Sequence, residues 1–215
     1  MQAVVEIITT DNTTFDTNDV FDWEEIKSHV YPRLAADNEF FLRDKPHTMV
    51  ADIPVTYNVK VREGASFYVT YQCLNAWGVS LEELHRTALQ NAEGTYIYAD
   101  VCQVLRSNPF APVLFEGDSG IYVLTNTDME FGASAIMDTE TMQSVAEQLG
   151  EKFYLVPSSI HECLAVPYND APGASDALLQ MVREVNATQL SAKDKLSDNV
   201  YLYDNIDKTI TVIAA

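Results

Sequence analysis

The sequence predicts an α+β fold in which helices pack on a mostly antiparallel sheet. Short β-branched or aromatic runs alternate with helical patterns along the chain. Brief polar turns join several of these runs into hairpins, and hairpins imply antiparallel pairing because parallel neighbours need a long crossover. The order strand–strand–helix recurs at about 50–93, 121–149 and 152–186, before a closing hairpin. Helices that each follow a hairpin are expected to cover one face of the sheet.

The first elements begin with an ambiguous apolar run. Residues 3–8 are apolar and β-branched, so strand and helix both remain open. A helix is expected from Asp22, where Glu25 completes a capping box, and Pro32 should kink it or end it early. Its apolar face at helical spacing comprises Trp23, Ile26, Val30 and Leu34.

Two β-rich runs follow at 50–61 and 66–73, and the short polar turn between them indicates a hairpin. Within the first run, Asp52 and Pro54 favour an edge position or a late start of the strand. A second capping box, Ser80 with Glu83, predicts the helix that comes next.

The middle of the chain contains the most plausible linker. Gly94 ends the preceding helix, and a weaker helix is expected over 98–106. The segment 108–117 contains two prolines and reads as a loop. We therefore expect an N-terminal α+β part, 1–110, and a C-terminal α+β part, 111–215, packed together as one compact unit.

The second half of the chain contains the clearest helix. Asp138 or Thr139 caps it, Gly150 ends it, and its apolar residues recur at helical spacing. The other elements expected are strands at 121–126, 131–137, 153–156 and 162–166, a helix over 175–185 that buries Leu178, Val182 and Val185, and a hairpin of 200–203 with 209–213.

Charge and cysteine usage limit the partners. Asp and Glu number 32 against 13 Lys and Arg, which gives a net charge of −19. Such a field repels phosphate backbones and anionic lipid head groups, so we expect neither nucleic acid nor a membrane as a partner. No apolar run has the length of a membrane span, and no secretory signal is recognisable. Cys73, Cys102 and Cys163 lie far apart among apolar neighbours, which favours reduced core residues of a cytoplasmic protein.

Gly117-Asp118-Ser119-Gly120 resembles the nucleophile segment of chymotrypsin-like serine proteases and of Gly-Asp-Ser lipases. The protease pattern needs a histidine in a small-residue context and a further glycine, where this chain has Ile121. The lipase pattern needs an Asp-x-x-His near the C-terminus, and the last histidine here is His161. The segment is therefore interpreted as an ordinary turn that leads into a strand.

The segment 157–162 carries the densest group of polar side chains between two expected strands: Ser158, Ser159, His161 and Glu162. The imidazole could act as a base toward either serine hydroxyl, or bind a metal together with Cys163, which shares its face of an extended segment. No second ligand pair has metal-site spacing and no nucleotide or other cofactor motif occurs, so we predict neither metal nor cofactor. The structural alternative is that hydroxyls and imidazole satisfy backbone groups of the loop.

Two further groups are candidates for binding. His47 and Asp52 form a polar group ahead of a strand, although a turn with an exposed histidine is the favoured interpretation. Tyr201 and Tyr203 occupy alternate positions of the last hairpin and could form a binding stripe. Tyrosines in such positions also pack half-buried sheet faces, so both interpretations stay open.

Several segments together resemble one family: Pro46-His47 with Asp52, then 75–84, 122–126, 155–162, 185–186, 196–198 and 201–204. They are similar to the domain-of-unknown-function family 5688, a group from anaerobic gut bacteria, over about residues 4–204. Members of that family carry an additional N-terminal segment. The resemblance therefore implies a truncated start at Met1 and shifts residues 3–8 toward the tail of a helix. It implies no activity, cofactor or site residue.

The sequence contains no complete catalytic set, so it favours a cytoplasmic binding or interaction domain. A tyrosine-rich, acidic sheet surface would take a protein partner or a small ligand. The alternative is a hydrolase-type enzyme that uses the polar residues of 157–162, with His47 and Asp52 brought near by folding. A hydrogen bond between imidazole and a serine hydroxyl would favour the enzyme, and a contiguous exposed apolar patch would favour the binding domain.

Overall fold

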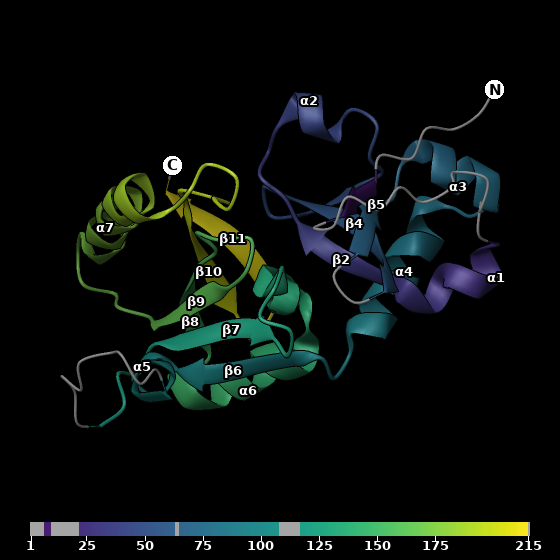
Figure 1. The fold of residues 1–215 in the computed structure, drawn as a ribbon. Helices are drawn as coiled ribbons and strands as arrows, with labels where there is room; N and C mark the ends of the chain where they lie inside the picture. Colours follow the sequence, from purple (N-terminus) through teal and green to yellow (C-terminus); the bar gives the residue numbers. More distant parts are fainter. Residues whose placement is uncertain (1–6, 10–21, 63–64, 108–116, 215) are drawn as a thin grey trace. The chain divides into compact units, whose positions relative to one another are not determined.

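The chain forms two units, each of which combines helices with antiparallel strands and so confirms the predicted α+β class. The computed structural model describes residues 7–9, 22–62, 65–107 and 117–214 (Figure 1). The first unit comprises Met1–Met49 and Pro54–Gly94, and the second comprises Val50–Ile53 and Thr95–Ala215. The expected division near residue 110 falls within 108–116, outside the described residues, and stays a prediction.

The sheet of the first unit has five strands in the order β1–β5–β4–β2, with β3 paired to β4. Their bounds are β1 Ile7–Thr9, β2 Val30–Leu34, β3 Thr48–Val50, β4 Ile53–Arg62 and β5 Ala65–Tyr68. The strands β4 and β5 form the antiparallel hairpin that the sequence predicted. The late start of β4 after Asp52 was also predicted, whereas β4 lies between two neighbours and not at an edge.

The described residues of the first unit form these helical segments: α1 Trp23–Ile26, the 3-10 helix η1 Lys27–His29, α2 Glu39–Leu42, α3 Tyr71–Trp77 and α4 Leu81–Ala92. The longest of them, α4, packs on β2. The hydroxyl of Ser80 caps α4 by accepting a hydrogen bond from the backbone N–H of Glu83 at 3.1 Å. Its apolar residues Leu84, Ala88 and Ala92 are buried, as the helical pattern indicated.

Two predicted elements of the first unit are wrong in type. The helix that starts after Asp22 ends at Ile26, and Val30–Leu34 is a strand, because it pairs with β4 along its whole length and alternates buried with half-buried residues. The β-rich run expected to reach Cys73 ends at Tyr68. There the Thr70 hydroxyl accepts a hydrogen bond from the Cys73 N–H and starts α3 instead.

The N-terminal apolar run also differs from the expectation that the family resemblance raised. Ile7 and Ile8 lie in strand β1, paired antiparallel with β5, and not in the tail of a helix. The rest of 3–8 lies outside the described residues. The pairing with β5 selects the strand, because the apolar run by itself was compatible with a strand and with a helix.

The second unit contains a six-stranded antiparallel sheet in the order β11–β10–β8–β9–β7–β6. The strands are β6 Tyr96–Asp100, β7 Tyr122–Asn126, β8 Lys152–Val156, β9 Cys163–Pro167, β10 Val200–Asp204 and β11 Thr209–Ala214. The helices are α5 Val101–Ser107, the 3-10 helix η2 Gly132–Met137, α6 Thr139–Leu149 and α7 Ala174–Gln189. The closing hairpin, the strands β7, β8 and β9 and the helix α6 were predicted. The helix expected over 98–106 begins only at Val101, because 98–100 belongs to the strand β6, which was not predicted.

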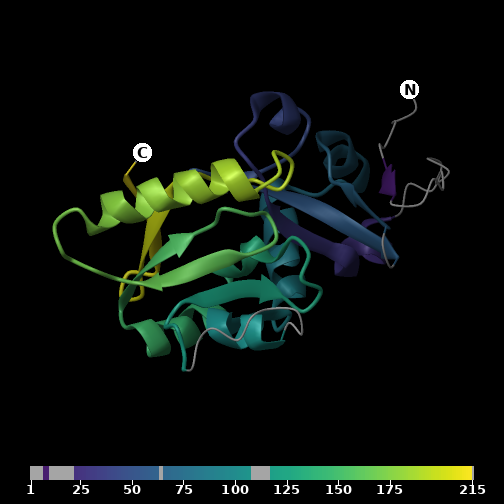
Figure 2. The ribbon, with the colours of Figure 1, turned by 60° about the vertical axis from the view of Figure 1, so that its left-hand side comes forward.

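The helices α6 and α7 lie on opposite faces of this sheet, so the expectation that helices cover one face is wrong for this unit (Figure 2). On β8, Tyr154 and Val156 pack against Leu179 and Val182 of α7. Phe153 and Leu155 point to the other face, because side chains alternate along a strand. That other face is fully buried at both positions.

The prediction of a strand at 131–137 is wrong, because this segment forms the 3-10 helix η2. Phe131 has φ +56°, which is incompatible with an extended strand. The central copy of the expected strand–strand–helix repeat therefore has a 3-10 helix in place of its second strand.

In α7 the buried residues are Leu179, Val182 and Asn186, so the predicted buried face is rotated slightly and leaves Val185 exposed.

Two expectations about composition can be compared with this fold. All three cysteines are buried and unpaired, which confirms their assignment as reduced core residues. Across 22–62, 65–107 and 117–214 we find no helix with both the length and the apolar character that a bilayer crossing requires.

Candidate functional site

The turn between β8 and β9 is held against the segment that follows α7. The backbone N–H of Ile160 donates to the Asp194 carbonyl at 2.9 Å, and the N–H of Leu196 donates to the Ser158 carbonyl at 2.8 Å. An antiparallel bridge pairs Ser159 with Lys195 between these two bonds. The polar cluster predicted at 157–162 therefore sits in a short ladder, and its partner segment lies more than thirty residues further along the chain.

The imidazole of His161 is held by groups from two other segments. Its Nδ1 accepts a hydrogen bond from the backbone N–H of Phe131 at 3.3 Å, and its ring stacks on the Phe131 ring with centroids 5.2 Å apart. Its Nε2 lies 3.5 Å from Oδ1 of Asp194. Because Nδ1 is an acceptor in this arrangement, the neutral ring carries its proton on Nε2, directed at the carboxylate. The pKa of Asp194 is lowered, first by the Ser191 hydroxyl that donates to it and also by the neighbouring His161.

The serine hydroxyls are not arranged as nucleophiles toward this imidazole. Ser159 is 3% exposed, and its Oγ accepts a hydrogen bond from the backbone N–H of His161 at 3.0 Å. Ser158 is half-buried and Glu162 is exposed. In the described part of the chain no hydrogen bond joins the imidazole to either hydroxyl. The structure brings Ser159 and His161 together through the backbone, and it adds Asp194 and Phe131, which the sequence did not indicate.

A metal at this turn finds no support in the surrounding groups. The Cys163 side chain is fully buried, its Sγ lies 3.5 Å from the Leu164 carbonyl oxygen, and burial raises the pKa of its thiol. Within the described ranges no group of three or more His, Cys, Asp or Glu residues is placed to hold a metal ion.

Asp52 and Tyr201, two of the predicted binding residues, meet in the second unit. The Tyr201 hydroxyl donates to Oδ1 of Asp52 at 2.6 Å, and Nδ2 of Asn199 donates to Oδ2 of Asp52 at 3.0 Å. The Ser197 hydroxyl lies 2.8 Å from that of Tyr201. Burial, followed by the Asp52 hydrogen bond, raises the pKa of Tyr201, so its hydroxyl remains a donor. Ser197 and Asn199 were missed because no motif connects them with Asp52 in the sequence.

The remaining predicted binding residues are placed differently. Tyr203 is 4% exposed and packs its ring on Phe153 at 5.0 Å, so Tyr201 and Tyr203 form part of the core and not an exposed stripe. His47 is half-buried in the first unit, where its Nδ1 lies 2.9 Å from the Lys45 carbonyl oxygen. It lies in the loop ahead of β3, and it is half-buried, not exposed as the structural alternative expected.

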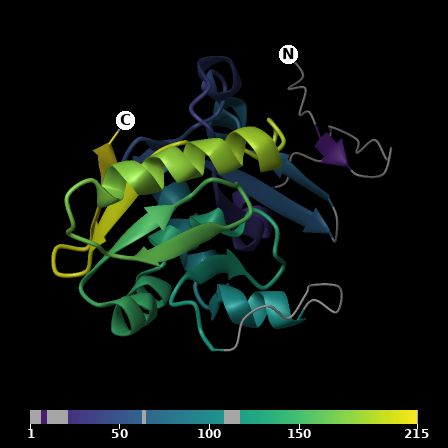
Figure 3. The ribbon, with the colours of Figure 1, turned by 90° about the vertical axis from the view of Figure 1, so that its left-hand side faces the viewer.

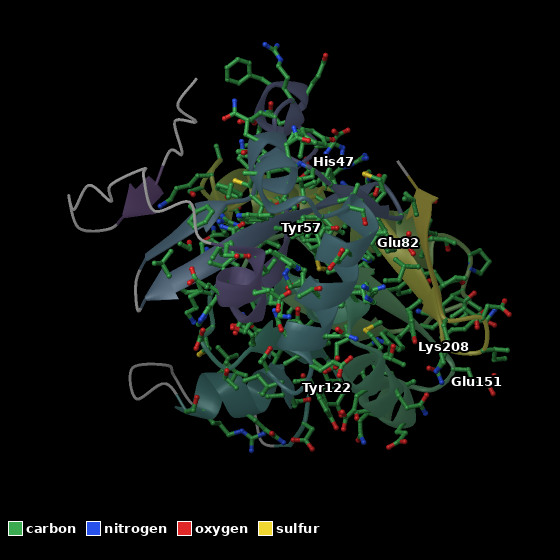
Figure 4. The ribbon with its side chains drawn as sticks, turned by 90° about the vertical axis from the view of Figure 1, so that its right-hand side faces the viewer. His47, Tyr57, Glu82, Tyr122, Glu151 and Lys208 are labelled. Carbon is green, nitrogen blue, oxygen red and sulfur yellow. The ribbon has the colours of Figure 1, made fainter. Side chains whose placement is uncertain are left out.

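A second histidine cluster lies in the first unit and escaped sequence reasoning. The hydroxyl of Tyr57, a fully buried residue labelled in Figure 4, is 2.8 Å from Nδ1 of His85 and 3.0 Å from the Thr48 hydroxyl. Burial raises the pKa of Tyr57 to about 12, and burial lowers the pKa of His85. The Tyr57 hydroxyl therefore keeps its proton, and its hydrogen bond joins it to a neutral imidazole. These residues stand on two strands and a helix, so only the tertiary structure brings them together.

The loop that resembles a hydrolase nucleophile segment encloses a buried carboxylate. One oxygen of Asp100 accepts hydrogen bonds from the N–H groups of Ser119 and Gly120, both at 2.9 Å, and from the Ser119 hydroxyl at 3.0 Å. The other oxygen accepts from the Cys102 N–H at 2.8 Å. The hydroxyl of Ser119 is thus a structural donor, and the interpretation of this segment as a turn is confirmed.

The clearest exposed feature of the second unit is the part of the sheet face that α7 leaves uncovered (Figure 3). Leu164 on β9 stands opposite Val123 on β7, and Ile97 on the edge strand β6 lies on the same face by alternation. Ile97 is 42% exposed, whereas Leu164, Val123 and Val166 are half-buried. Apolar side chains therefore continue across this face beyond the helix.

One flank of α7 extends this apolar surface. Met181 is 61% exposed and Val185 is 48% exposed. Arg183, on the other flank, acts electrostatically on Asp198 just before β10. The flank that carries Met181 and Val185 consequently faces β9, as the usual right-handed crossover from β9 through α7 to β10 also requires. We call this surface the open sheet face; it comprises Ile97, Val123, Leu164, Val166, Met181 and Val185.

The comparisons with known proteins agree with the family that the sequence segments resemble. Neither the curated proteins nor the solved structures contain a match to the chain. A model of the family described as "Family of unknown function (DUF5688)" matches residues 1–205. That match covers both sheets up to the turn after β10, so the chain belongs to the DUF5688 family.

Proposed function

We propose that this chain is a protein-interaction domain and that its partner binds the open sheet face. The observation that carries the proposal is a set of apolar side chains on one face between β6 and the flank of α7, exposed at Ile97, Met181 and Val185 and half-buried between them. Contiguous apolar surface of this kind marks interaction sites more often than isolated apolar residues do. Burial of one such aliphatic side chain contributes about 1.5–3 kcal/mol, so a few of them suffice for recognition.

The charges around the open sheet face specify the chemistry of the partner. The exposed Glu162 precedes β9 and the exposed Asp170 follows it, so carboxylates flank the strand that crosses this face. The chain as a whole carries a net charge of −19. A partner segment that combines apolar side chains with Lys or Arg at its margins complements both features. An acidic segment would be repelled.

The same proposal includes a cytoplasmic location without nucleic-acid or membrane partners. Its support is the strongly negative net charge and the three buried, unpaired cysteines. A reducing compartment keeps such thiols free.

Binding can be tested with a fluorescent amphipathic helical peptide of Leu and Lys, whose anisotropy is measured as the full chain is added. We expect the double variant M181D/V185D to bind at least about tenfold more weakly, a change that corresponds to about 1.4 kcal/mol. The same peptide with Glu in place of Lys should not bind. Added salt should weaken the binding of the Lys peptide, because it screens opposite charges.

The matched control is the double variant I206D/V212D. Ile206 is 67% exposed and Val212 is 37% exposed, and both lie outside the open sheet face. Both double variants add the same charge, so a general electrostatic effect would change binding equally. Equal loss in both variants, or no loss in M181D/V185D, contradicts the proposal.

The alternative function, a hydrolase-type enzyme, draws support from one observation. His161 faces Asp194 as a catalytic base faces its orienting carboxylate, although its Nδ1 is occupied by the Phe131 N–H. Hydrolysis of a chromogenic acetyl ester by the wild-type chain, lost in both H161A and S159A, would favour this alternative over the binding domain. A second check is a pull-down with wild-type and H161A protein, in which loss of one specific partner only in the variant would assign the turn to binding.

A further inference from the structure

We propose that two copies of this chain associate through the outer edge of β6 and form one continuous antiparallel sheet across a two-fold axis. This inference rests on the edge strand itself and does not depend on partner binding to the open sheet face. The strand β6 is the last in the sheet and pairs with β7 over all five residues without a register shift.

The hydrogen bonds at the two ends of β6 show which backbone groups point outward. The N–H of Thr127 donates to the Thr95 carbonyl at 3.0 Å, and the N–H of Val101 donates to the Ile121 carbonyl at 2.9 Å. Hydrogen-bonded and non-hydrogen-bonded pairs alternate in an antiparallel ladder. The odd-numbered residues of this stretch therefore bond to β7, and the even-numbered residues direct their N–H and C=O groups away from it.

Among the residues that the structure describes, the outer edge of β6 carries no proline, lysine or β-bulge that would prevent strand addition. Its sequence is Tyr-Ile-Tyr-Ala-Asp. The carboxylate of Asp100 is turned inward to the Cys102, Ser119 and Gly120 amides, so it places no free negative charge along the outer edge. Exposed apolar side chains lie on both faces, with Ile97 at 42% and Tyr98 at 36%.

A second copy fits this edge because β6 is complementary to itself. Outward-pointing residues must pair with outward-pointing residues, and full overlap places Tyr98 opposite Tyr98 of the second copy. The same register places Tyr96 opposite Asp100, so no like charges face each other. Two tyrosines in direct cross-strand contact stabilise such a pair. On the other face Ile97 lies opposite Ala99 of the second copy, which joins the two open sheet faces into one surface.

The expected dimer is weak and depends on salt in a characteristic direction. A five-residue strand pair buries less than the roughly 1,200 Å² of a stable specific interface. Each copy also carries a net charge of −19, and this repulsion opposes association. Salt shortens the Debye length from about 8 Å at 0.15 M to about 3 Å at 1 M, so it should strengthen the dimer. Binding of a cationic peptide to the open sheet face should change in the opposite direction.

The test is sedimentation velocity of the full chain at concentrations from micromolar to millimolar, at low and at high salt. The wild type should show a dimer fraction that rises with both concentration and salt. Y98K and Y98E should each remain monomeric, because the substitution places two like charges opposite each other. An equimolar mixture of Y98K and Y98E should recover the dimer, since Lys and Glu then face each other across the axis.

The mixture separates a lost interface from a lost fold, because two unfolded variants would not recover association together. I206K, on a residue that is 67% exposed and distant in sequence from β6, is the control and should sediment as the wild type does. A wild type that is monomeric at high concentration and high salt overturns the proposal. So does a dimer that persists in Y98K, or a mixture that stays monomeric.

Discussion

Gly132, at the start of η2, has neighbours on three sides that leave no room for a side chain. A Cβ atom there would lie 2.3 Å from the Thr125 hydroxyl, 2.5 Å from the Asn126 backbone nitrogen and 2.9 Å from the His161 carbonyl oxygen. Two of these three atoms belong to the backbone, so no change of rotamer relieves the contact. The close approach of η2 to β7 and to the 157–162 turn thus requires glycine at this position.

We expect Gly132→Ala to lower the free energy of unfolding by about 3 kcal/mol, because an overpacked site must displace backbone. Urea unfolding followed by circular dichroism measures this loss. Gly78→Ala is the control: Gly78 has φ +69° but no atom within 4 Å of an added Cβ, so only the left-handed backbone conformation costs free energy, about 1 kcal/mol. Equal losses in the two variants would show that Gly132 is not sterically confined.

At the scale of residues, the sequence predicted what depends on near neighbours. Asp138 caps α6 by accepting a hydrogen bond from the Thr141 N–H at 2.9 Å, as its position before a helical pattern indicated. The sequence did not reveal that Asp194 faces His161, because a turn after α7 brings the two residues together and no local pattern indicates such a contact. For the same reason the cluster of Tyr57, Thr48 and His85 had no counterpart in the sequence.

The loop between α5 and β7 shows how a single carboxylate organises an element. Asp100 is 2% exposed, and its two oxygens accept four hydrogen bonds from the chain around it. Burial alone raises the pKa of Asp100, but the donors Ser119, Cys102 and Gly120 outweigh it, and the pKa of the folded state is lowered. The charged form is therefore the form that holds this loop.

Because the folded pKa of Asp100 is lowered, its contribution to stability is present above the unfolded pKa of 3.8 and is lost as the pH falls through the lower, folded value. We expect Asp100→Asn to destabilise the chain by about 2–4 kcal/mol at pH 7, since an amide turns an N–H group toward backbone donors. The variant should lose less stability than the wild type between pH 5 and pH 3, as urea midpoints at several pH values would show. Parallel acid profiles would contradict this role.

At the scale of elements, hairpins and capped helices were predictable and context-dependent segments were not. The pairing of β4 with β5 and the closing hairpin were both predictable from turn residues in the sequence. By contrast, Val30–Leu34 satisfies helical and alternating patterns together, and pairing with β4 selects the strand. In η2, the small apolar residues predict a strand from the sequence alone, because the sequence does not show that tertiary contacts confine Gly132.

At the scale of the whole molecule, the two units differ in their spectroscopic reporters. The chain has two tryptophans, Trp23 and Trp77, and their rings lie 5.6 Å apart within the first unit. Tryptophan fluorescence therefore reports on the first unit alone. Asp52, which belongs to the second unit, holds the buried hydroxyl of Tyr201 and the amide of Asn199.

We expect Asp52→Ala to destabilise the second unit by about 1–2 kcal/mol, because it leaves the buried Tyr201 hydroxyl without its carboxylate acceptor. The tyrosine signal in near-ultraviolet circular dichroism should shift to lower urea concentration more than the tryptophan fluorescence does. Glu147→Ala removes an exposed carboxylate from α6 and should shift neither signal. A common shift of both signals in Asp52→Ala would mean that the effect is not confined to the second unit.

The contacts of His161 also have a kinetic consequence. Its ring bonds to Phe131, 30 residues away, and approaches Asp194 in the segment after α7. Such contacts form only after long loops close, and local elements such as α6 and the β10–β11 hairpin need no such closure. The contacts of the imidazole should therefore be absent from the folding transition state. Removing the imidazole should then speed unfolding and leave the folding rate nearly unchanged. His161 then governs how long the native turn persists, and has little influence on how fast the chain reaches it.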